Sequence, residues 1–166
     1  QKLTTGCKRE SRMQSLKHLR TLINEVPPKL SKLPLSQVEL KPSPVKWSPK
    51  EELGHLLDSA ANNHQRIVRT QLEHEPKMPG YDGDAWVELH KYQQRNWQEM
   101  IDLWRDLNRQ LLAAAEAAPE SAWSRTCTIA DSLPLTLKFV FEDYIDHMVH
   151  HLKHIGVQVD NLKPEA

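Results

Sequence analysis

Cysteine is scarce in this sequence, and neither sign of charge is in excess. The 166 residues include two cysteines, Cys7 and Cys127, and no Cys-x-x-Cys pair. The chain therefore has no disulfide framework, and we expect reduced thiols in a cytoplasmic protein. Lys and Arg together number 22, as do Asp and Glu, so the formal net charge is zero. Nucleic-acid-binding domains normally have a basic excess or a basic stripe, so we expect no nucleic-acid partner.

Long apolar runs and sustained two-residue alternation are also missing. No run of 18 apolar residues occurs, so we expect no membrane-spanning segment. What recurs instead is the three- and four-residue spacing of apolar side chains that is typical of amphipathic helices. It is found in four long stretches: residues 11–26, then 48–72, 96–118 and 136–159. Pro27-Pro28 interrupts the first stretch, and a short helical continuation from there through Leu33 stays open.

Helix-capping residues mark the starts of several of these stretches. Ser48 and Glu51 have the spacing of a capping box, with a proline between them at the first helical position. Asn96 followed by Glu99 is a second start signal. Asp84 is predicted to cap a short additional helix.

The sequence therefore predicts an all-α protein, a four-helix bundle with one or two additional short helices. We expect residues 1–10 to be frayed, residues 11–160 to form a single domain, and residues 161–166 to be a tail. The proline-bounded connector 119–134 is expected to contain no strand, including Thr126–Ile129.

Histidine is concentrated in the last helical stretch. Four of the nine histidines fall within eight residues: His147, His150, His151 and His154. His147/His151 and His150/His154 are separated by four residues, and each pair can direct two imidazoles to one point, as helices do when they bind a divalent metal. A solvated histidine-rich face, or core histidines satisfied by hydrogen bonds, would give the same pattern.

A helical wheel separates the two pairs. The core stripe runs through Tyr144, Met148 and Ile155, with His151 in it and His147 beside it, whereas His150 turns most toward solvent. Metal sites in bundles use inward-projecting side chains. The wheel therefore favours His147/His151, with His150/His154 as the alternative.

A catalytic metal usually has three protein ligands, so a third is needed. The candidates in the rest of the chain are His18, His55, His64, His74 and His90. His64 lies on the apolar stripe of the second stretch and His55 lies off it, so the wheel alone favours His64.

Four segments, taken in order, resemble the DinB superfamily, and most closely its YfiT-like branch of metal-dependent hydrolases and bacillithiol transferases. The segments are Trp47-Ser48-x-x-Glu51-x-x-x-His55-Leu56-x-Asp58-Ser59, Arg66, Tyr81-Asp82-x-x-Ala85-Trp86-x-Glu88-Leu89 and His147-x-x-His150-His151-x-x-His154-Ile155. The resemblance extends from about Leu22 to the last helical stretch.

The resemblance implies a four-helix bundle, commonly a homodimer, that binds a divalent metal through His55, His147 and His151. Zinc and nickel are the metals expected first, and iron and manganese also suit such a site. It further implies a hydrolase or thiol S-transferase that activates water or a small thiol. The substrate would be a small molecule, with a low-molecular-weight thiol as one option.

The resemblance does not assign a catalytic residue. Many family members have His-Arg-Gly-Gln after the last ligand, whereas His151 is followed here by Leu152-Lys153-His154. His154 and Asp58 are therefore candidates for proton transfer, with a surface histidine and an ordinary helix acid as the alternatives. Two other functions stay open: a non-catalytic dimeric bundle with a structural metal, and a stress-related partner protein.

Overall fold

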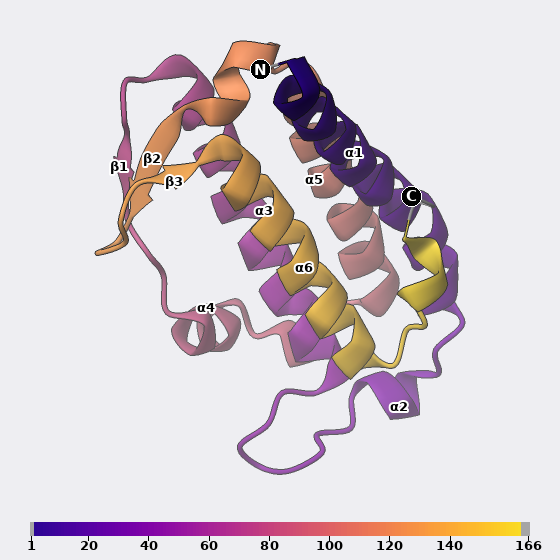
Figure 1. Ribbon diagram of the computed structural model, residues 1–166. Coiled ribbons are helices and arrows are strands. Elements are labelled where there is room, and N and C mark those ends of the chain that lie inside the picture. Colours follow the sequence, from indigo (N-terminus) through magenta and orange to yellow (C-terminus); the bar gives the residue numbers. More distant parts are fainter. Residues whose placement is uncertain (1, 164–166) are drawn as a thin grey trace.

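The computed structural model describes residues 2–163, with side chains from Glu10 onward, and its architecture is a helical bundle (Figure 1). The four long helices are α1 (Lys2–Ser31), α3 (Pro49–Leu72), α5 (Trp97–Glu116) and α6 (Leu137–Ile155). The shorter elements are α2 (Leu35–Val38), α4 (Gly83–His90) and the 3-10 turns η1 (Tyr92–Gln94), η2 (Glu120–Ser124) and η3 (Asp160–Leu162). None of the described helices has the length and apolarity needed to cross a bilayer.

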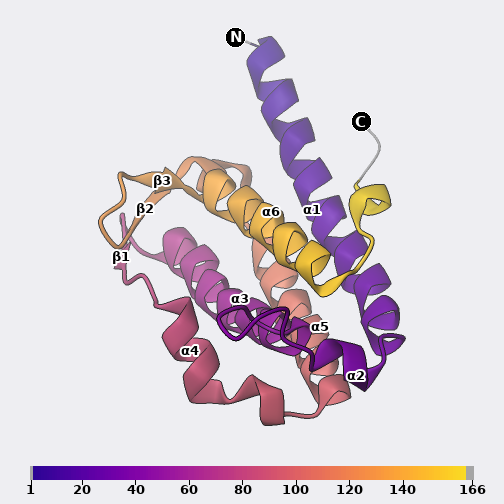
Figure 2. The same ribbon diagram turned by 90° about the horizontal axis from the view of Figure 1, so that it is seen from below.

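Helix α3 has two long neighbours. It packs against α5 and against α6, while α1 packs against α5 and also contacts α6 (Figure 1). The N-terminal part of α1 projects beyond the other helices (Figure 2). The prediction of an all-α four-helix bundle is confirmed. Because α3 lies between two helices, one of its faces packs against α6.

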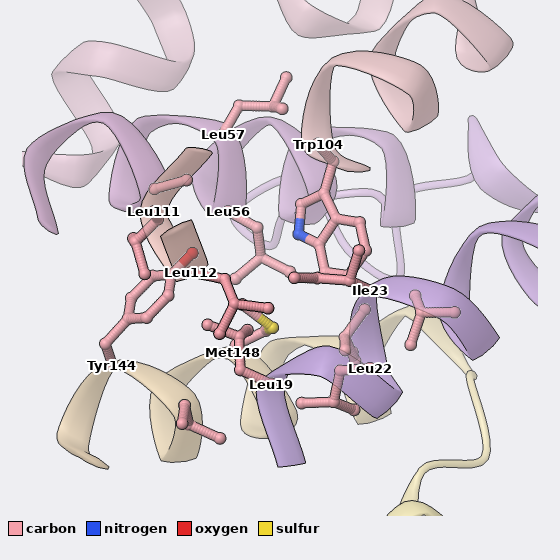
Figure 3. Packing of buried hydrophobic residues seen from close by; sticks show 14 of the residues in the cluster. Leu19, Leu22, Ile23, Leu56, Leu57, Trp104, Leu111, Leu112, Tyr144 and Met148 are labelled. Atoms are coloured by element: carbon pink, nitrogen blue, oxygen red, sulfur yellow. The ribbon is translucent and has the colours of Figure 1, made fainter. Parts of the chain in front are cut away.

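The core is formed by large apolar side chains from all four long helices. Figure 3 shows Leu19 and Leu22 of α1, Leu56 of α3, Trp104 of α5 and Met148 of α6 meeting in one cluster, each at most 1 % exposed. Burying one such side chain contributes about 1.5–3 kcal/mol to stability. This packing fixes the positions of α3 and α6 relative to each other.

The predicted capping box is present at the start of α3. The hydroxyl of Ser48 accepts from the backbone N–H of Glu51 at 3.2 Å, and the carboxylate of Glu51 accepts from the N–H of Ser48 at 2.9 Å. Asn96 likewise caps α5 by accepting from the N–H of Glu99 at 3.0 Å. These contacts fix the first turn of α3, and His55 follows in the next turn.

The short helix α4 is capped two residues earlier than predicted. The carboxylate of Asp82 accepts from the N–H of Ala85 at 3.1 Å, and Asp84 lies inside the first turn. The prediction of Asp84 as the cap is wrong, because the helix already begins at Gly83.

Helix α1 begins earlier than the sequence predicts, and it is continuous across the two prolines where an interruption was expected. It begins at Lys2, within the segment predicted to be frayed, and it continues through Pro27 and Pro28 to Ser31. Each proline removes a helical donor, but Val26 and Leu30 on either side are fully buried. Their packing keeps the helix regular where local preference would end it.

A small three-stranded sheet closes one end of the bundle, and no sheet was predicted. Strand β1 (Lys77–Met78) pairs in parallel with β2 (Thr126–Ile129), which pairs in antiparallel with β3 (Leu135–Thr136). The prediction that Thr126–Ile129 forms no strand is wrong. This segment is too short to show a two-residue period, and its partner β1 is about 50 residues away in the sequence, so only the fold brings the strands together.

A core residue lies in the stretch predicted to be a C-terminal tail. Leu162, in η3, is 8 % exposed and belongs to the main core cluster. The predicted tail, residues 161–166, therefore includes a core residue, and its last three residues lie outside the described part of the chain.

The 3-10 turn η1 is held against α3 by a close approach at Gly54. A Cβ atom at Gly54 would lie 2.1 Å from Cδ2 of Tyr92, so only glycine leaves room for this ring. The hydroxyl of Tyr92 then donates to Oδ1 of Asp58 at 2.6 Å. One aromatic side chain thereby ties the segment after α4 to the middle of α3.

We expect Gly54→Ala to lower the free energy of unfolding by about 1 to 2 kcal/mol, because overpacking at Tyr92, at the upper end of its usual range of about 1–3 kcal/mol, outweighs the gain of about 1 kcal/mol in helix propensity. The matched control is Gln65→Ala, an exposed position of the same helix. Chemical denaturation of both variants measures the difference. Equal or higher stability of Gly54→Ala would contradict the packing at this position.

Candidate metal centre

Three histidines from two helices meet between α3 and α6. His55 projects from α3, and His147 and His151 project from successive turns of α6. The ring centroids are separated by 5.0 Å for His55–His147, 4.6 Å for His55–His151 and 4.4 Å for His147–His151. One ring nitrogen from each lies within 4.8 Å of the others. The structure therefore brings together the three residues that the sequence and the resemblance indicate.

The spacing of the nitrogens suits a shared metal ion. Nε2 of His55 and Nε2 of His147 are 3.1 Å apart. Two nitrogens bound at 2.0–2.1 Å to one tetrahedral ion would be roughly 3.3 to 3.4 Å apart. A shift of a few tenths of an ångström would thus convert the present arrangement into a ligand pair, and neutral imidazole is a preferred ligand of zinc, nickel and iron.

A carboxylate from α3 orients the third ring. Nδ1 of His151 lies 2.5 Å from Oε2 of Glu52, whose side chain is 12 % exposed. Carboxylate–histidine–metal arrangements hold the ring in one tautomer, which leaves the opposite nitrogen free to bind the ion. Burial acts to raise the pKa of Glu52, but the hydrogen bond and charge of His151, with the help of His154, lower the pKa overall. Glu52 is therefore held as an acceptor.

The sequence interpretation missed Glu52. It lies three residues before His55 and so on the same face of α3, which is the signal that identifies it once His55 is known as a site residue.

A second polar contact supports His147. Its Nδ1 is 3.4 Å from the hydroxyl of Ser59, and that hydroxyl also accepts from the side-chain amide of Asn63 at 3.3 Å. Asn63 in turn accepts from Arg66 at 3.3 Å. Arg66, one of the residues that carry the resemblance, therefore acts on the histidines through other side chains.

Aromatic side chains cover the exposed side of the three histidines. The Trp47 ring lies 4.7 Å from that of His55 and 6.2 Å from that of His151, centroid to centroid. The Tyr81 ring lies 6.4 Å from that of His55. The start of α4 completes this cover, because a Cβ on Gly83 would lie 3.2 Å from Cε1 of His55.

Burial keeps two of the rings uncharged. Desolvation, followed by the nearby charge of His151, lowers the pKa of His55 to about 4. Desolvation, followed by the charges of His151 and His55, likewise lowers the pKa of His147 to about 4. At neutral pH both rings therefore present a lone pair, which is the form that binds a metal.

The catalytic candidates from the sequence lie in different surroundings. His154 is half-exposed, with Nδ1 3.4 Å from Oε1 of Glu52, and forms a second group with Glu52 and His151. Asp58 is buried, and its carboxylate contacts Tyr92 and His90. Among the described side chains, Asp58 forms no hydrogen bond with the three histidines. Burial raises its pKa against the lowering effect of the Tyr92 hydrogen bond.

The other third-ligand candidates are not part of the histidine cluster. His64, which the wheel favours, lies on a later turn of α3, and His18 lines a separate cavity with Glu142 and Asp146. His74 lies in the loop after α3, and His90 lies beside Asp58. The wheel assumes a single apolar stripe, whereas α3 is buried along nearly its whole circumference from Lys50 to Ala60.

Sequence comparison agrees with this geometry. The pattern that defines the DinB superfamily matches residues 11–155. The chain belongs to the DinB superfamily. A protein of Bacillus subtilis (strain 168) named "Putative metal-dependent hydrolase YfiT" is 26 % identical over 139 residues, which are 81 % of this chain and 78 % of YfiT.

Two solved structures of DinB-type proteins share the fold. YfiT of Bacillus subtilis, described as a probable metal-dependent hydrolase with an unusual four-helix bundle topology, superposes with a TM-score of 0.65 at 18 % identity, covering 91 % of this chain and 89 % of YfiT. The DinB-like protein YjoA of the same organism gives 0.56 at 18 % identity, covering 94 % and 93 %. The DinB resemblance stated from the motifs is confirmed.

We expect Glu52→Ala to weaken zinc binding by about 10- to 100-fold, because His151 loses the acceptor that orients its ring. The matched control is Glu88→Ala, an exposed glutamate on α4. Competition with a chromophoric chelator measures both affinities. Unchanged zinc affinity of Glu52→Ala would contradict the role given to this carboxylate.

The metal-free protein should lose stability as the pH falls below neutrality. Unfolded histidines have a pKa of about 6.5, above the folded values of about 4 for His55 and His147. The unfolded state therefore binds more protons between these values, and the stabilising contribution present above pH 6.5 is lost toward pH 4.

We expect a decrease of roughly 2 to 3 kcal/mol for this pair between pH 7 and pH 5.5. Urea denaturation in the presence of a chelator measures it. The double variant His55→Gln/His147→Gln serves as the control and should show a flatter dependence. An equally steep dependence in that variant would show that other groups cause the loss.

Proposed function

We propose that this protein is a metal-dependent enzyme that acts on a small-molecule substrate. In this proposal one divalent ion is bound by His55, His147 and His151. The observation that carries the proposal is the convergence of three ring nitrogens within 4.8 Å. The name of its relative, "Putative metal-dependent hydrolase YfiT", supports the same class of activity.

A divalent ion at this site would lower the pKa of a coordinated water or thiol and so supply a nucleophile near neutral pH. The reaction is accordingly hydrolysis or transfer of a small thiol. We propose zinc or nickel as the metal; iron and manganese are the alternatives, because affinity order alone does not set metal occupancy in cells.

The residues around the histidines have separate tasks in this proposal. Glu52 holds the ring of His151, and Trp47 limits the access of water to the site. His154 reaches Glu52 from the solvent side and is half-exposed, so its ring is able to exchange a proton with both the site and bulk water. We propose His154 as the proton-transfer residue and Asp58 as a positioning residue that holds Tyr92.

A structural metal site is the main alternative. Such sites are normally closed by four protein ligands. The group formed by His55, His147 and His151 contains three ligands within the described part of the chain, and the buried thiol of Cys127 packs in a separate cluster with Met78 and Val140. An ion with three protein ligands keeps a position for water or substrate, which favours the enzyme.

Two further expectations belong to the same proposal. A homodimer is proposed from the DinB resemblance, and a cytoplasmic location from the low cysteine content.

We expect untagged protein to bind about one divalent ion per chain after incubation with zinc or nickel and desalting. His55→Ala, His147→Ala and His151→Ala should each reduce occupancy at least tenfold, because two imidazoles alone make a weak site. His64→Ala and His74→Ala are the matched controls and should retain full occupancy. Metal analysis by mass spectrometry gives the result. A wild-type chain that stays metal-free in excess zinc and nickel at neutral pH would overturn the proposal.

A further inference from the structure

A cavity of about 590 Å³ lies beside the metal centre. It is bounded by α2 and the loop that follows it, by the start of α3 and by the end of α6, at the lower end of the bundle in Figure 1. Its volume falls within the range of roughly 300–1,000 Å³ found for small-molecule sites. The cavity is lined by Gln37, Leu40, Pro42, Lys46, Trp47, Pro49, Glu52 and His154.

Two of the residues that line the cavity also contact the histidines of the metal centre. The Trp47 ring packs on the ring of His55 at 4.7 Å, and Glu52 accepts from His151 at 2.5 Å. Glu52 and His154 therefore form the boundary between cavity and histidines. A second large cavity, between α1 and α5, contains none of the nine histidines in its lining, so the first cavity is the one placed to supply a substrate.

The wall of the cavity is largely apolar. Leu40, Pro42, Trp47 and Pro49 provide most of it, and Leu40 is 68 % exposed. A leucine left this open at the rim of a concave surface is covered when an apolar group enters. The wall thus selects a ligand with an apolar body.

A single cation of the loop is available to such a ligand. Lys41 pairs with Glu51 and Lys50 pairs with Glu39, each at 3.0 Å. Lys46, also on the cavity wall, forms no ion pair with any described residue. Its ammonium group can therefore bind an anionic group at the rim of the cavity without breaking an existing ion pair.

We infer that the substrate of the proposed enzyme is an amphipathic anion, a small molecule with an apolar body and a carboxylate or similar group. The apolar body lies against Leu40 and Trp47, and the anionic group meets Lys46. The reacting group extends past Glu52 and His154 toward the three histidines. This inference rests on the proposed function, because it takes the cavity as the entrance to the metal centre.

Binding of 8-anilinonaphthalene-1-sulfonate, an apolar fluorescent anion, tests the inference on the folded full-length chain. Leu40→Glu and Lys46→Glu should each weaken binding at least fivefold. Val45→Glu is the matched control for Leu40, because Val45 is 92 % exposed in the same loop but does not line the cavity. Lys32→Glu controls for the change of charge. Both controls should bind as the wild type does.

Competition then tests the preference for an anion. Octanoate should displace the probe at a lower concentration than octylammonium does in the wild type, and Lys46→Glu should reverse this order. Absence of probe binding to the wild type, equal binding by the cavity variants and their controls, or a wild-type preference for octylammonium would each overturn the inference.

Metal analysis of the same variants separates the two proposals. Leu40→Glu and Lys46→Glu should keep wild-type metal occupancy, since neither residue contacts the histidines. Unchanged probe binding with intact metal binding would remove the substrate class and leave the metal centre in place. A metal-free wild type that still binds the probe through Leu40 and Lys46 would remove the proposed function and leave a ligand pocket.

Discussion

The contact between the Nε2 atoms of His55 and His147, at 3.1 Å, is the constraint on which the functional region depends. Two imidazole nitrogens at this distance cannot both carry a hydrogen toward each other. Either one donates to the other, or both direct lone pairs to a shared cation. Burial keeps both rings neutral, and the third ring, that of His151, is turned toward them by Glu52. The arrangement is preorganised for a divalent ion because the core holds α3 and α6 at a fixed separation.

Much of the site comes from one short segment, residues 47–59. Ser48 and Glu51 start the helix, Glu52 contacts a histidine of α6, and His55 is the proposed ligand from α3. Ser59 then reaches the second histidine of α6. The loop before this segment forms the cavity wall, so binding of a substrate there would act directly on the residues that orient the histidines. A single folded segment would thus connect the proposed substrate entrance with the proposed metal centre.

The sequence predicts the parts of this structure that depend on local rules. The capping box at Ser48 and the cap at Asn96 follow from side chains that bond to backbone groups three residues away. His147 and His151 are found by a helical wheel because α6 has one dominant buried stripe. His55 is not found in this way, because α3 is buried on two sides and a single stripe does not describe it; the DinB resemblance supplies it instead.

The sequence does not predict the features that depend on contacts with residues far away in the chain. The strand Thr126–Ile129 exists because β1 lies beside it, and α1 passes through two prolines because Val26 and Leu30 are buried. Glu52 is recognised as a site residue only once His55, three residues further along α3, is known to belong to the site.

X-ray absorption spectroscopy of the protein loaded with one equivalent of zinc tests the central claim most directly. The account predicts three imidazole nitrogens at about 2.0–2.1 Å and one further light ligand from solvent; fewer than three imidazoles, or a sulfur ligand, would contradict it.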